Sequence, residues 1–111
     1  MTIRELIDSG LFQVISEGEE LNRTVDSVFC CDLLSIAMGK APAGCAWVTV
    51  MGNINTLAVV ALTDAACVVL AGGVRLDEAA AAKAKQQHIT VLATEQPVFE
   101  TALAIHQRIH G

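Results

Sequence analysis

Residues 46–73, AWVTVMGNINTLAVVALTDAACVVLAGG, decide the fold. The run Ala46 to Val50 is apolar, too short for a helix and without clean polar alternation, which is typical of a strand covered on both faces. Asn53 caps the helix that follows. A second apolar strand, Cys67 to Ala71, ends at the pair Gly72-Gly73. Such a strand, helix and strand in succession predict parallel strands joined by a right-handed crossover.

The same alternation of strand and helix continues on both sides of this stretch. Toward the C-terminus we expect a helix over Asp77 to Gln87, a strand over Ile89 to Ala93, and a helix over Val98 to Ile109 with Pro97 as its first residue. Toward the N-terminus we expect a helix after the capping box Thr2 to Glu5, a strand over Leu11 to Ile15, an extended run over Val25 to Cys30, and a helix from the cap Asp32 to Gly39. The prediction is a three-layer α/β sandwich with a mainly parallel sheet, built as one domain over residues 1–111.

Composition narrows the class of protein. The chain is 53% hydrophobic and only 17% charged, so it buries enough apolar surface to fold. Its net charge is -5 and its seven basic residues are scattered, which argues against nucleic acid as a partner. Neither a secretory signal nor a run of about 20 apolar residues is present, so no membrane association and a cytoplasmic location are expected. The low charge favours an exposed apolar patch and a homodimer.

A candidate ligand site lies in the loops that leave three predicted strands. The carboxyl ends of parallel strands meet at one edge of a sheet, where helix N-termini point free N–H groups outward. Glycines allow close backbone approach, asparagines offer amides, and an arginine offers a fork for phosphate or carboxylate. The candidate residues are Gly52, Asn53, Asn55, Gly72, Gly73, Arg75 and Thr94. They predict a small-anion or nucleotide site; the alternative is ordinary turn and capping chemistry, because no established phosphate-loop motif occurs.

Catalytic and metal-binding patterns are absent from the sequence in any specific form. His106 and His110 are four residues apart on the final helix, but no acidic residue accompanies them as in H-E-x-x-H. Helix boundaries account for Asp32 and Asp64, and no nucleophile signature surrounds Ser35. We therefore expect no enzyme activity, no catalytic residue, no metal and no cofactor.

The four cysteines form no C-x-x-C pair. Cys67 lies in an apolar run, where a buried small hydrophobe is expected. Cys30 and Cys31 are neighbours in an extended run, so one is expected in the core and the other exposed and reactive. Cys45 is a further candidate for an exposed thiol.

Four stretches of the chain form a recognisable series: VDSV to CDLL over 25–34, WVTV with GNIN over 47–55, VVLAGG over 68–73, and ITVLAT before FETA over 89–102. In their order and spacing they resemble the DRTGG domain, and the likeness covers nearly the whole chain. The glycine pair Gly72-Gly73 stands where the family has Thr-Gly-Gly, with Ala71 in place of the threonine. The family's Asp-Arg pair falls near residues 53–55, where this sequence has neither an Asp nor an Arg.

This resemblance implies an α/β regulatory or ligand-sensing module that tends to associate with itself, similar also to the amino-terminal domain of HPr kinase. Relatives occur beside CBS domains that bind adenine nucleotides, and small stand-alone members often occur near genes for iron hydrogenases. The leading hypothesis is therefore a non-enzymatic, self-associating sensor of a small molecule such as an adenine nucleotide. The alternative is an accessory factor for another protein, for example in hydrogenase or metallocluster maturation, that uses an exposed cysteine.

Overall fold

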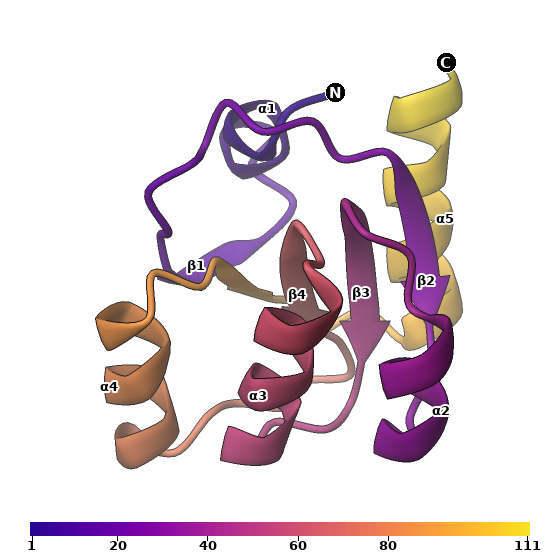
Figure 1. Cartoon of the computed structure of the whole chain (residues 1–111). Coiled ribbons are helices and arrows are strands. Elements are labelled where there is room, and N and C mark those ends of the chain that lie inside the picture. Colours follow the sequence, from indigo (N-terminus) through magenta and orange to yellow (C-terminus); the bar gives the residue numbers. More distant parts are fainter.

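The computed structural model describes residues 1–111 and contains one five-stranded sheet in the order β1-β5-β4-β3-β2 (Figure 1). The strands are β1 (Gln13–Ser16), β2 (Ser27–Cys30), β3 (Cys45–Thr49), β4 (Cys67–Leu70) and β5 (Val91–Ala93). The helices are α1 (Ile3–Asp8), α2 (Leu34–Lys40), α3 (Ile54–Thr63), α4 (Glu78–Gln86) and α5 (Val98–His110). Strands β2 to β5 are parallel to one another, and β1 pairs antiparallel with β5. None of the helices combines the length and apolar character that a membrane crossing requires.

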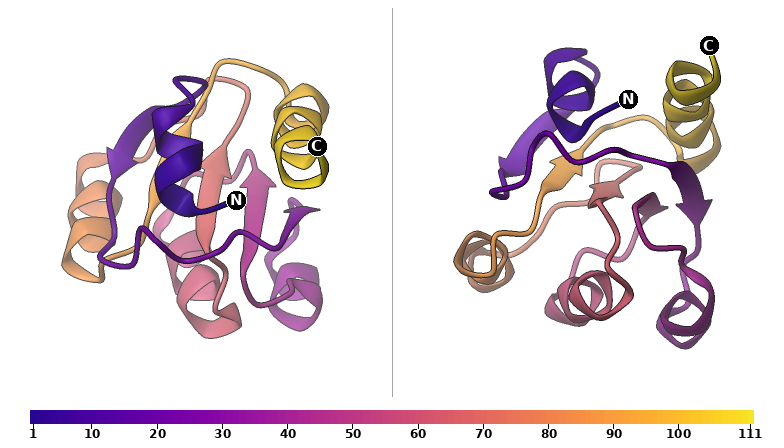
Figure 2. Two further views of the ribbon diagram at one scale, coloured as in Figure 1. Left: turned by 90° about the horizontal axis from the view of Figure 1, so that it is seen from above. Right: turned by 45° about the horizontal axis from the view of Figure 1, so that its top comes forward.

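The helices form a layer on each face of the sheet, which confirms the predicted three-layer α/β sandwich. Figure 2 shows α2, α3 and α4 side by side along one face and α1 and α5 on the other. Buried side chains divide in the same way into two clusters, one containing residues of α2, α3 and α4, and the other containing residues of α1 and α5. The predicted elements are all present, and most of their bounds shift by one or two residues.

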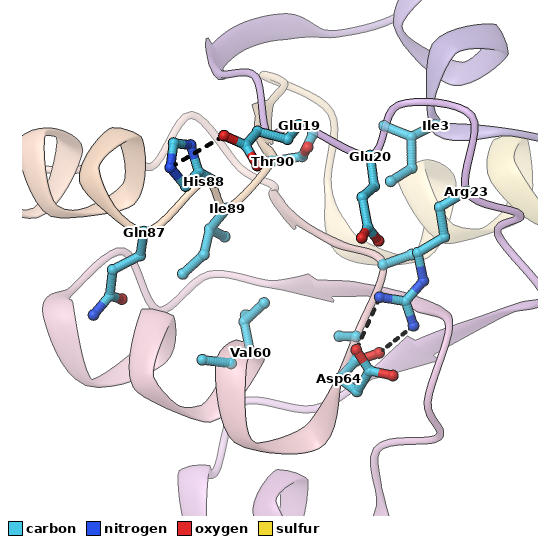
Figure 3. Close-up of a pocket in the computed structure, with 13 residues that line it drawn as sticks. Ile3, Glu19, Glu20, Arg23, Val60, Asp64, Gln87, His88, Ile89 and Thr90 are labelled. Carbon is cyan, nitrogen blue, oxygen red and sulfur yellow. Dashed lines mark hydrogen bonds and ion pairs between the residues drawn. The ribbon is translucent and has the colours of Figure 1, made fainter.

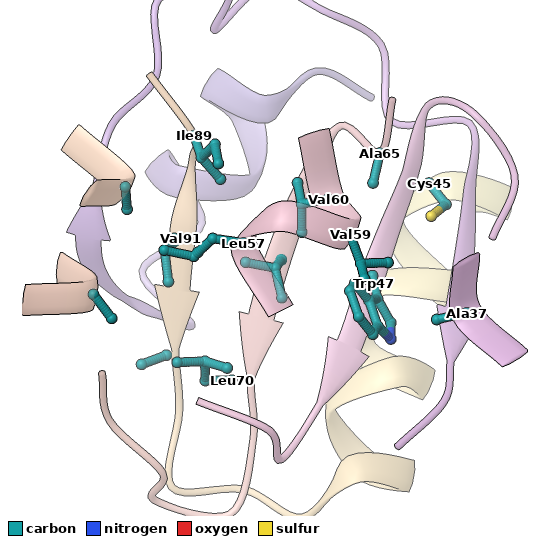
Figure 4. Close-up of a cluster of buried hydrophobic side chains, with 14 residues drawn as sticks. Ala37, Cys45, Trp47, Leu57, Val59, Val60, Ala65, Leu70, Ile89 and Val91 are labelled. Atoms are coloured by element: carbon teal, nitrogen blue, oxygen red, sulfur yellow. The ribbon is translucent and has the colours of Figure 1, made fainter. Parts of the chain in front are cut away.

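The central strands β3 and β4 are buried at every position, as the continuous apolar runs predict. Side chains alternate between the two clusters because successive residues of a strand point to opposite faces. Trp47 and Val68 lie on the α3 side, whereas Val48 and Val69 lie on the α5 side. Figure 4 shows Trp47 packed beside Val59, with Leu57, Val60 and Leu70 in the same layer. These strands fix the positions from which the loops at the sheet's carboxyl edge depart.

One capping prediction is wrong. The N-cap of α2 is Leu33, which makes no side-chain cap hydrogen bond. The Asp32 carboxylate instead accepts from the Thr49 hydroxyl at 2.8 Å and from the Val50 N–H at 3.1 Å. Because Thr49 is fully buried, its hydroxyl needs a partner, and Asp32 provides one across the sheet. A carboxylate expected to act locally thus ties the turn after β2 to the end of β3.

Two other helix starts follow their predictions more closely. Asn53 caps α3 by accepting from the N–H groups of Asn55 and Thr56. The Thr2–Glu5 capping box at α1 is complete, with both side chains bonded to the expected backbone groups. Pro97, expected as the first helical residue, is the residue just before α5. Its lack of an N–H suits either place.

Candidate functional site

The turns that leave β4 and β5 lie against each other at the carboxyl edge of the sheet, which we call the rim. The Gly72 N–H donates to the Gln96 carbonyl at 2.7 Å, and the Gly73 N–H donates to the Thr94 carbonyl at 3.0 Å. Both glycines have positive φ, 68° and 79°, which explains why this turn carries glycine. The hydrogen bonds that hold the rim together thus occupy the N–H groups of the glycine pair.

The turn after β3 packs against the same region. A Cβ added to Gly52 would lie 2.8 Å from the Arg75 carbonyl oxygen and 2.8 Å from Val74 Cγ1. No other residue type fits between the two turns without movement. Gly52 therefore contacts the loop that carries Arg75, as predicted for loops meeting at one edge.

Four helices begin at or near this rim, because each follows a parallel strand. Asn53 caps α3, and Asp77 caps α4 by accepting from the Ala80 N–H at 2.7 Å. Helix α5 is different, since Pro97 precedes it without any side-chain cap. A helix N-terminus carries partial positive charge and free N–H groups that favour an anion. Among the helices longer than seven residues, α5 alone begins without a side-chain cap.

Arg75 has an internal partner that the sequence did not indicate. Its guanidinium donates to Glu95 Oε1 at 2.8 Å and to the Val74 carbonyl at 3.2 Å. The side chains of Arg75 and Glu95 are 40% and 79% exposed, so the pair is well solvated. A Cβ on Gly73 would lie 2.6 Å from Glu95 Oε2, so the glycine leaves room for this carboxylate. The two residues are 20 positions apart, and no motif links them.

A cleft on the rim has a volume of about 590 Å³. Its walls are the segment that leads into β1 and the turn after β5, and its lining residues are Gly10, Leu11, Phe12, Gln13, Arg75, Ala93, Thr94, Glu95 and Gln96. A smaller hollow of about 200 Å³ shares four of these residues and extends along the first turns of α5. The cleft thus holds Arg75, and the adjoining hollow holds Glu100 and Thr101 of the first turn of α5.

The structure brings the predicted site residues to one rim but does not place all of them in this cleft. Arg75 and Thr94 line it. Gly52, Asn53 and Asn55 lie toward β3, and neither they nor Gly72 and Gly73 are among the lining residues. The missed lining residues include Leu11 and Phe12, which reach the rim because the start of β1 pairs with the end of β5. Antiparallel pairing between the first and last strands has no local sequence signal.

A second hollow, of about 340 Å³, lies at the opposite end of the sheet, where β4 and β5 begin (Figure 3). Arg23 donates to the Asp64 carboxylate at 2.9 Å and to its carbonyl at 2.7 Å. His88 Nε2 lies 3.3 Å from Glu19 Oε1. Asp64 and His88 both have positive φ, at the C-terminal ends of α3 and α4. Helix C-termini carry partial negative charge, so the ends of α3 and α4 make this hollow less suited to an anion than the rim, where helices begin.

The cysteines differ from their predictions in two respects. Cys45, considered as an exposed thiol, is fully buried, as is Cys67. Burial raises the pKa of Cys45 to about 11 and that of Cys67 to about 12. Cys30 is exposed, while Cys31 is only half-buried, so neither lies in the core. The alternation rule did not apply because β2 ends at Cys30 and Cys31 belongs to the following turn.

Chemistry at Cys30 is limited by its surroundings. Desolvation, and to a lesser degree the negative charge of Asp32, raises the pKa of this thiol. A raised pKa reduces the thiolate fraction at neutral pH and with it the nucleophilicity. No group of three or more His, Cys, Asp or Glu side chains is arranged to hold a metal ion.

Comparison with known proteins agrees with this architecture. A search of curated proteins finds no match. The fold is similar to a crystal structure of the CBS and DRTGG domains of the regulatory region of Clostridium perfringens pyrophosphatase, complexed with its activator diadenosine tetraphosphate. The TM-score is 0.76 at 16% identity, and the likeness covers 96% of this chain and 46% of that one. The family model of the DRTGG domain matches residues 11–108, and the chain therefore belongs to the DRTGG domain family.

Proposed function

We propose that this chain is a non-enzymatic regulatory domain that binds a small anionic ligand, with an adenine nucleotide as the first candidate, at the rim. In this proposal Arg75 and Thr94 contact the ligand in the rim cleft. The site extends along the rim toward Gly52, Asn53, Asn55, Gly72 and Gly73, which do not line the cleft. The observation that carries the proposal is the rim cleft, which contains Arg75 and adjoins a smaller hollow along the first turns of the uncapped helix α5. The pyrophosphatase region of similar fold, crystallised with a nucleotide activator, supports the choice of ligand.

The size and walls of the cleft suit such a ligand. A volume of about 590 Å³ lies within the usual range of small-molecule sites, about 300 to 1,000 Å³. Leu11 and Phe12 offer apolar surface for a base, while Arg75 and the N–H groups at the start of α5 offer donors for phosphate. Apolar surface for a base and donors for phosphate are thus available in two adjoining hollows that share Leu11 and Phe12.

The negative charge of Glu95 opposes the binding of an anion at Arg75. Its carboxylate occupies the Arg75 guanidinium and would repel an anion, so the ligand must exchange places with it. An exposed ion pair of this kind stabilises the protein by only about 0 to 1 kcal/mol. A ligand with several negative charges therefore loses little binding free energy by displacing Glu95 from Arg75. The variant Glu95→Gln removes the repulsion and should bind the anion more tightly than wild type.

Calorimetric melting with ligand tests the proposal. A ligand present at about 100 times its Kd stabilises the folded state by about 2.7 kcal/mol, which for 111 residues raises Tm by about 11 °C. We expect this order of shift with ATP, AMP or diadenosine tetraphosphate. Loss of a charge-assisted hydrogen bond weakens binding about tenfold, so Arg75→Ala should reduce the shift to about 6 °C.

The matched control is Arg108→Ala, which removes an exposed arginine from the last turn of α5, far from the rim. It should leave the ligand-induced shift unchanged. Asn53→Ala tests whether the site extends toward β3, and it should reduce the shift. An undiminished shift in Arg75→Ala would place the site elsewhere, and no shift with any nucleotide or with phosphate would refute ligand binding.

Self-association as a homodimer is the second part of the proposed function. The surface carries exposed large hydrophobic side chains, of which Leu62 and Phe99 are the most exposed at 71% and 70%. Apolar surface that water contacts in the monomer is covered when two copies associate. Sedimentation at micromolar concentration should give twice the chain mass, and a monomer throughout would refute this part.

The accessory-factor alternative depends on Cys30, the most exposed thiol. Titration of the native protein with a thiol reagent tests it. A slow reaction at Cys30 is expected from its raised pKa and would weigh against a thiol-based role. Rapid modification of Cys30 would favour the alternative.

A further inference from the structure

An apolar groove of about 270 Å³ lies between strand β2 and helix α5. Five of its six lining residues are hydrophobic, and the set is Val28, Cys30, Phe99, Ala102, Leu103 and His106. The side chains of Phe99 and Leu103 are 70% and 40% exposed. An apolar hollow bordered by such side chains is typical of an interaction surface.

The strand beside this groove is an unprotected sheet edge. Strand β2 pairs only with β3, and its residues Ser27–Cys30 include no charge and no proline. The opposite edge, β1, has a register shift between Val14 and Ser16. Charges, prolines, irregular pairing and short strands are devices by which native proteins block pairing at an edge. Both edge strands have four residues, but only β1 is irregularly paired, so β2 is the edge better suited to pairing with another strand.

Exposed apolar side chains continue on the other face of the same edge. Leu33, Ile36 and Met38, at the start of α2 and within it, are 58%, 43% and 45% exposed. With Phe99 and Leu103 they make up five of the ten large hydrophobic residues that the protein exposes. Figure 2 shows α2 and α5 on opposite faces at the β2 end of the sheet.

The charges on α5 indicate what covers this edge. Glu100 lies in the first turn, and Arg108 and His110 lie in the last turn. A second copy of α5 laid antiparallel would set the acidic end of each helix beside the basic end of the other. A twofold axis at Leu103 would bring Glu100 of one copy level with His106 of the other. A parallel copy would instead set like charges together.

The same axis also suits the strands. Helix α5 runs opposite to β2 (Figure 1). A twofold axis perpendicular to the sheet therefore makes the β2 pair and the α5 pair antiparallel at once. The edge strand and the groove of one copy then meet the same edge strand and groove of the other copy. Such self-complementary contact is the condition for a closed twofold dimer.

We infer that a second copy of this chain binds at the β2–α5 edge, with β2 antiparallel to the partner's β2 and α5 antiparallel to the partner's α5. This inference rests on the self-association put forward under the proposed function and names its surface. A stable interface covers about 800 Å² on each partner, about one seventh of the 5572 Å² surface of the chain. The edge strand, the groove and the exposed α2 residues all lie at the β2 end of the sheet and are the candidate area.

Sedimentation of charge variants tests the surface. The double variant Phe99→Glu with Leu103→Glu places carboxylates in the groove at exposed positions, where the fold tolerates them. Its mass should fall from twice the chain mass to the chain mass, with an unchanged circular dichroism spectrum. Leu62→Glu on α3, 71% exposed, is the matched control and should stay dimeric.

Further outcomes distinguish failure of the proposed β2–α5 interface from failure of dimer formation itself. A wild-type protein that is monomeric at every concentration overturns both the proposed dimer and this surface. A double variant that remains dimeric overturns the surface alone, and dissociation by Val14→Glu would assign the interface to β1. As an independent check, Leu103→Cys in a background with Cys30→Ser and Cys31→Ser should crosslink two copies through a short bismaleimide. Absence of that crosslink in a dimeric protein would also overturn the arrangement.

Discussion

Replacing Gly52 by alanine tests whether the rim turns pack as described. The new Cβ would lie 2.8 Å from the Arg75 carbonyl oxygen and 2.8 Å from Val74 Cγ1. One of these atoms belongs to the backbone, so the contact is not relieved by rotation of a side chain. The φ of Gly52 is not positive, and alanine adopts its conformation without strain. Any loss of stability therefore comes from the contact between the two turns.

The size of the effect follows from two opposing terms. Overpacking of this kind costs about 1 to 3 kcal/mol. A glycine-to-alanine change also stabilises by about 0.4 to 1 kcal/mol through the unfolded chain. The middle values of the two ranges differ by about 1.3 kcal/mol, so Gly52→Ala should lose about that much free energy of unfolding, or about 6 °C in Tm for a chain of this length.

Urea denaturation of wild type and two variants measures this difference. Gly39→Ala is the matched control, because a Cβ there meets nothing within 4 Å and the residue lies inside α2. That variant should gain about 0.5 to 1 kcal/mol from better helix propensity. Gly52→Ala should in addition weaken nucleotide binding, since the turns move apart. A Gly52→Ala protein as stable as wild type would refute the close contact of the turns.

Three further predictions concern single side chains. Asp32→Ala should lower the free energy of unfolding by about 1 to 3 kcal/mol, because it leaves the proton of the buried Thr49 hydroxyl without an acceptor; equal urea midpoints would contradict this role of Asp32. Because burial raises the pKa of Cys67 to about 12, its stabilising effect is complete below about pH 9 and is lost as pH rises. Between pH 8 and pH 10 wild type should therefore lose about 1.4 kcal/mol more than Cys67→Ala, and parallel losses would show that this thiol is not the cause. Glu95→Gln should bind nucleotide more tightly in titration calorimetry, since it frees Arg75, and weaker binding would assign Glu95 a direct role in the site.

The elements of the fold are predictable from the sequence because their signals are local. Continuous apolar runs predicted β3 and β4, and Asn53 and the Thr2–Glu5 box predicted helix starts that are all confirmed. The order of the strands in the sheet could not be predicted from such local patterns. Placing β1 beside β5 depends on packing between the two ends of the chain, which no local pattern specifies.

In the candidate site too, the features that follow from local patterns were predicted and the long-range side-chain contacts were not. The gathering of the three turns at one rim follows from parallel strands, so Gly72, Gly73 and Thr94 were predicted to lie together, and they do. The pairing of Arg75 with Glu95 joins residues far apart in sequence and could not be read from spacing. The bond from Thr49 to Asp32 is of the same long-range kind, so a local cap was the wrong expectation.

The buried indole described in the core has a practical consequence. Trp47 is the single tryptophan, and the chain has no tyrosine. Its Nε1–H donates to the Cys31 carbonyl at 2.9 Å, and the residue is fully shielded from water. Fluorescence excited at wavelengths that phenylalanine does not absorb therefore comes from one indole, which lies where β3 contacts the turn after β2. The emission maximum of Trp47 therefore reports on the contact between β3 and this turn, and no attached label is needed.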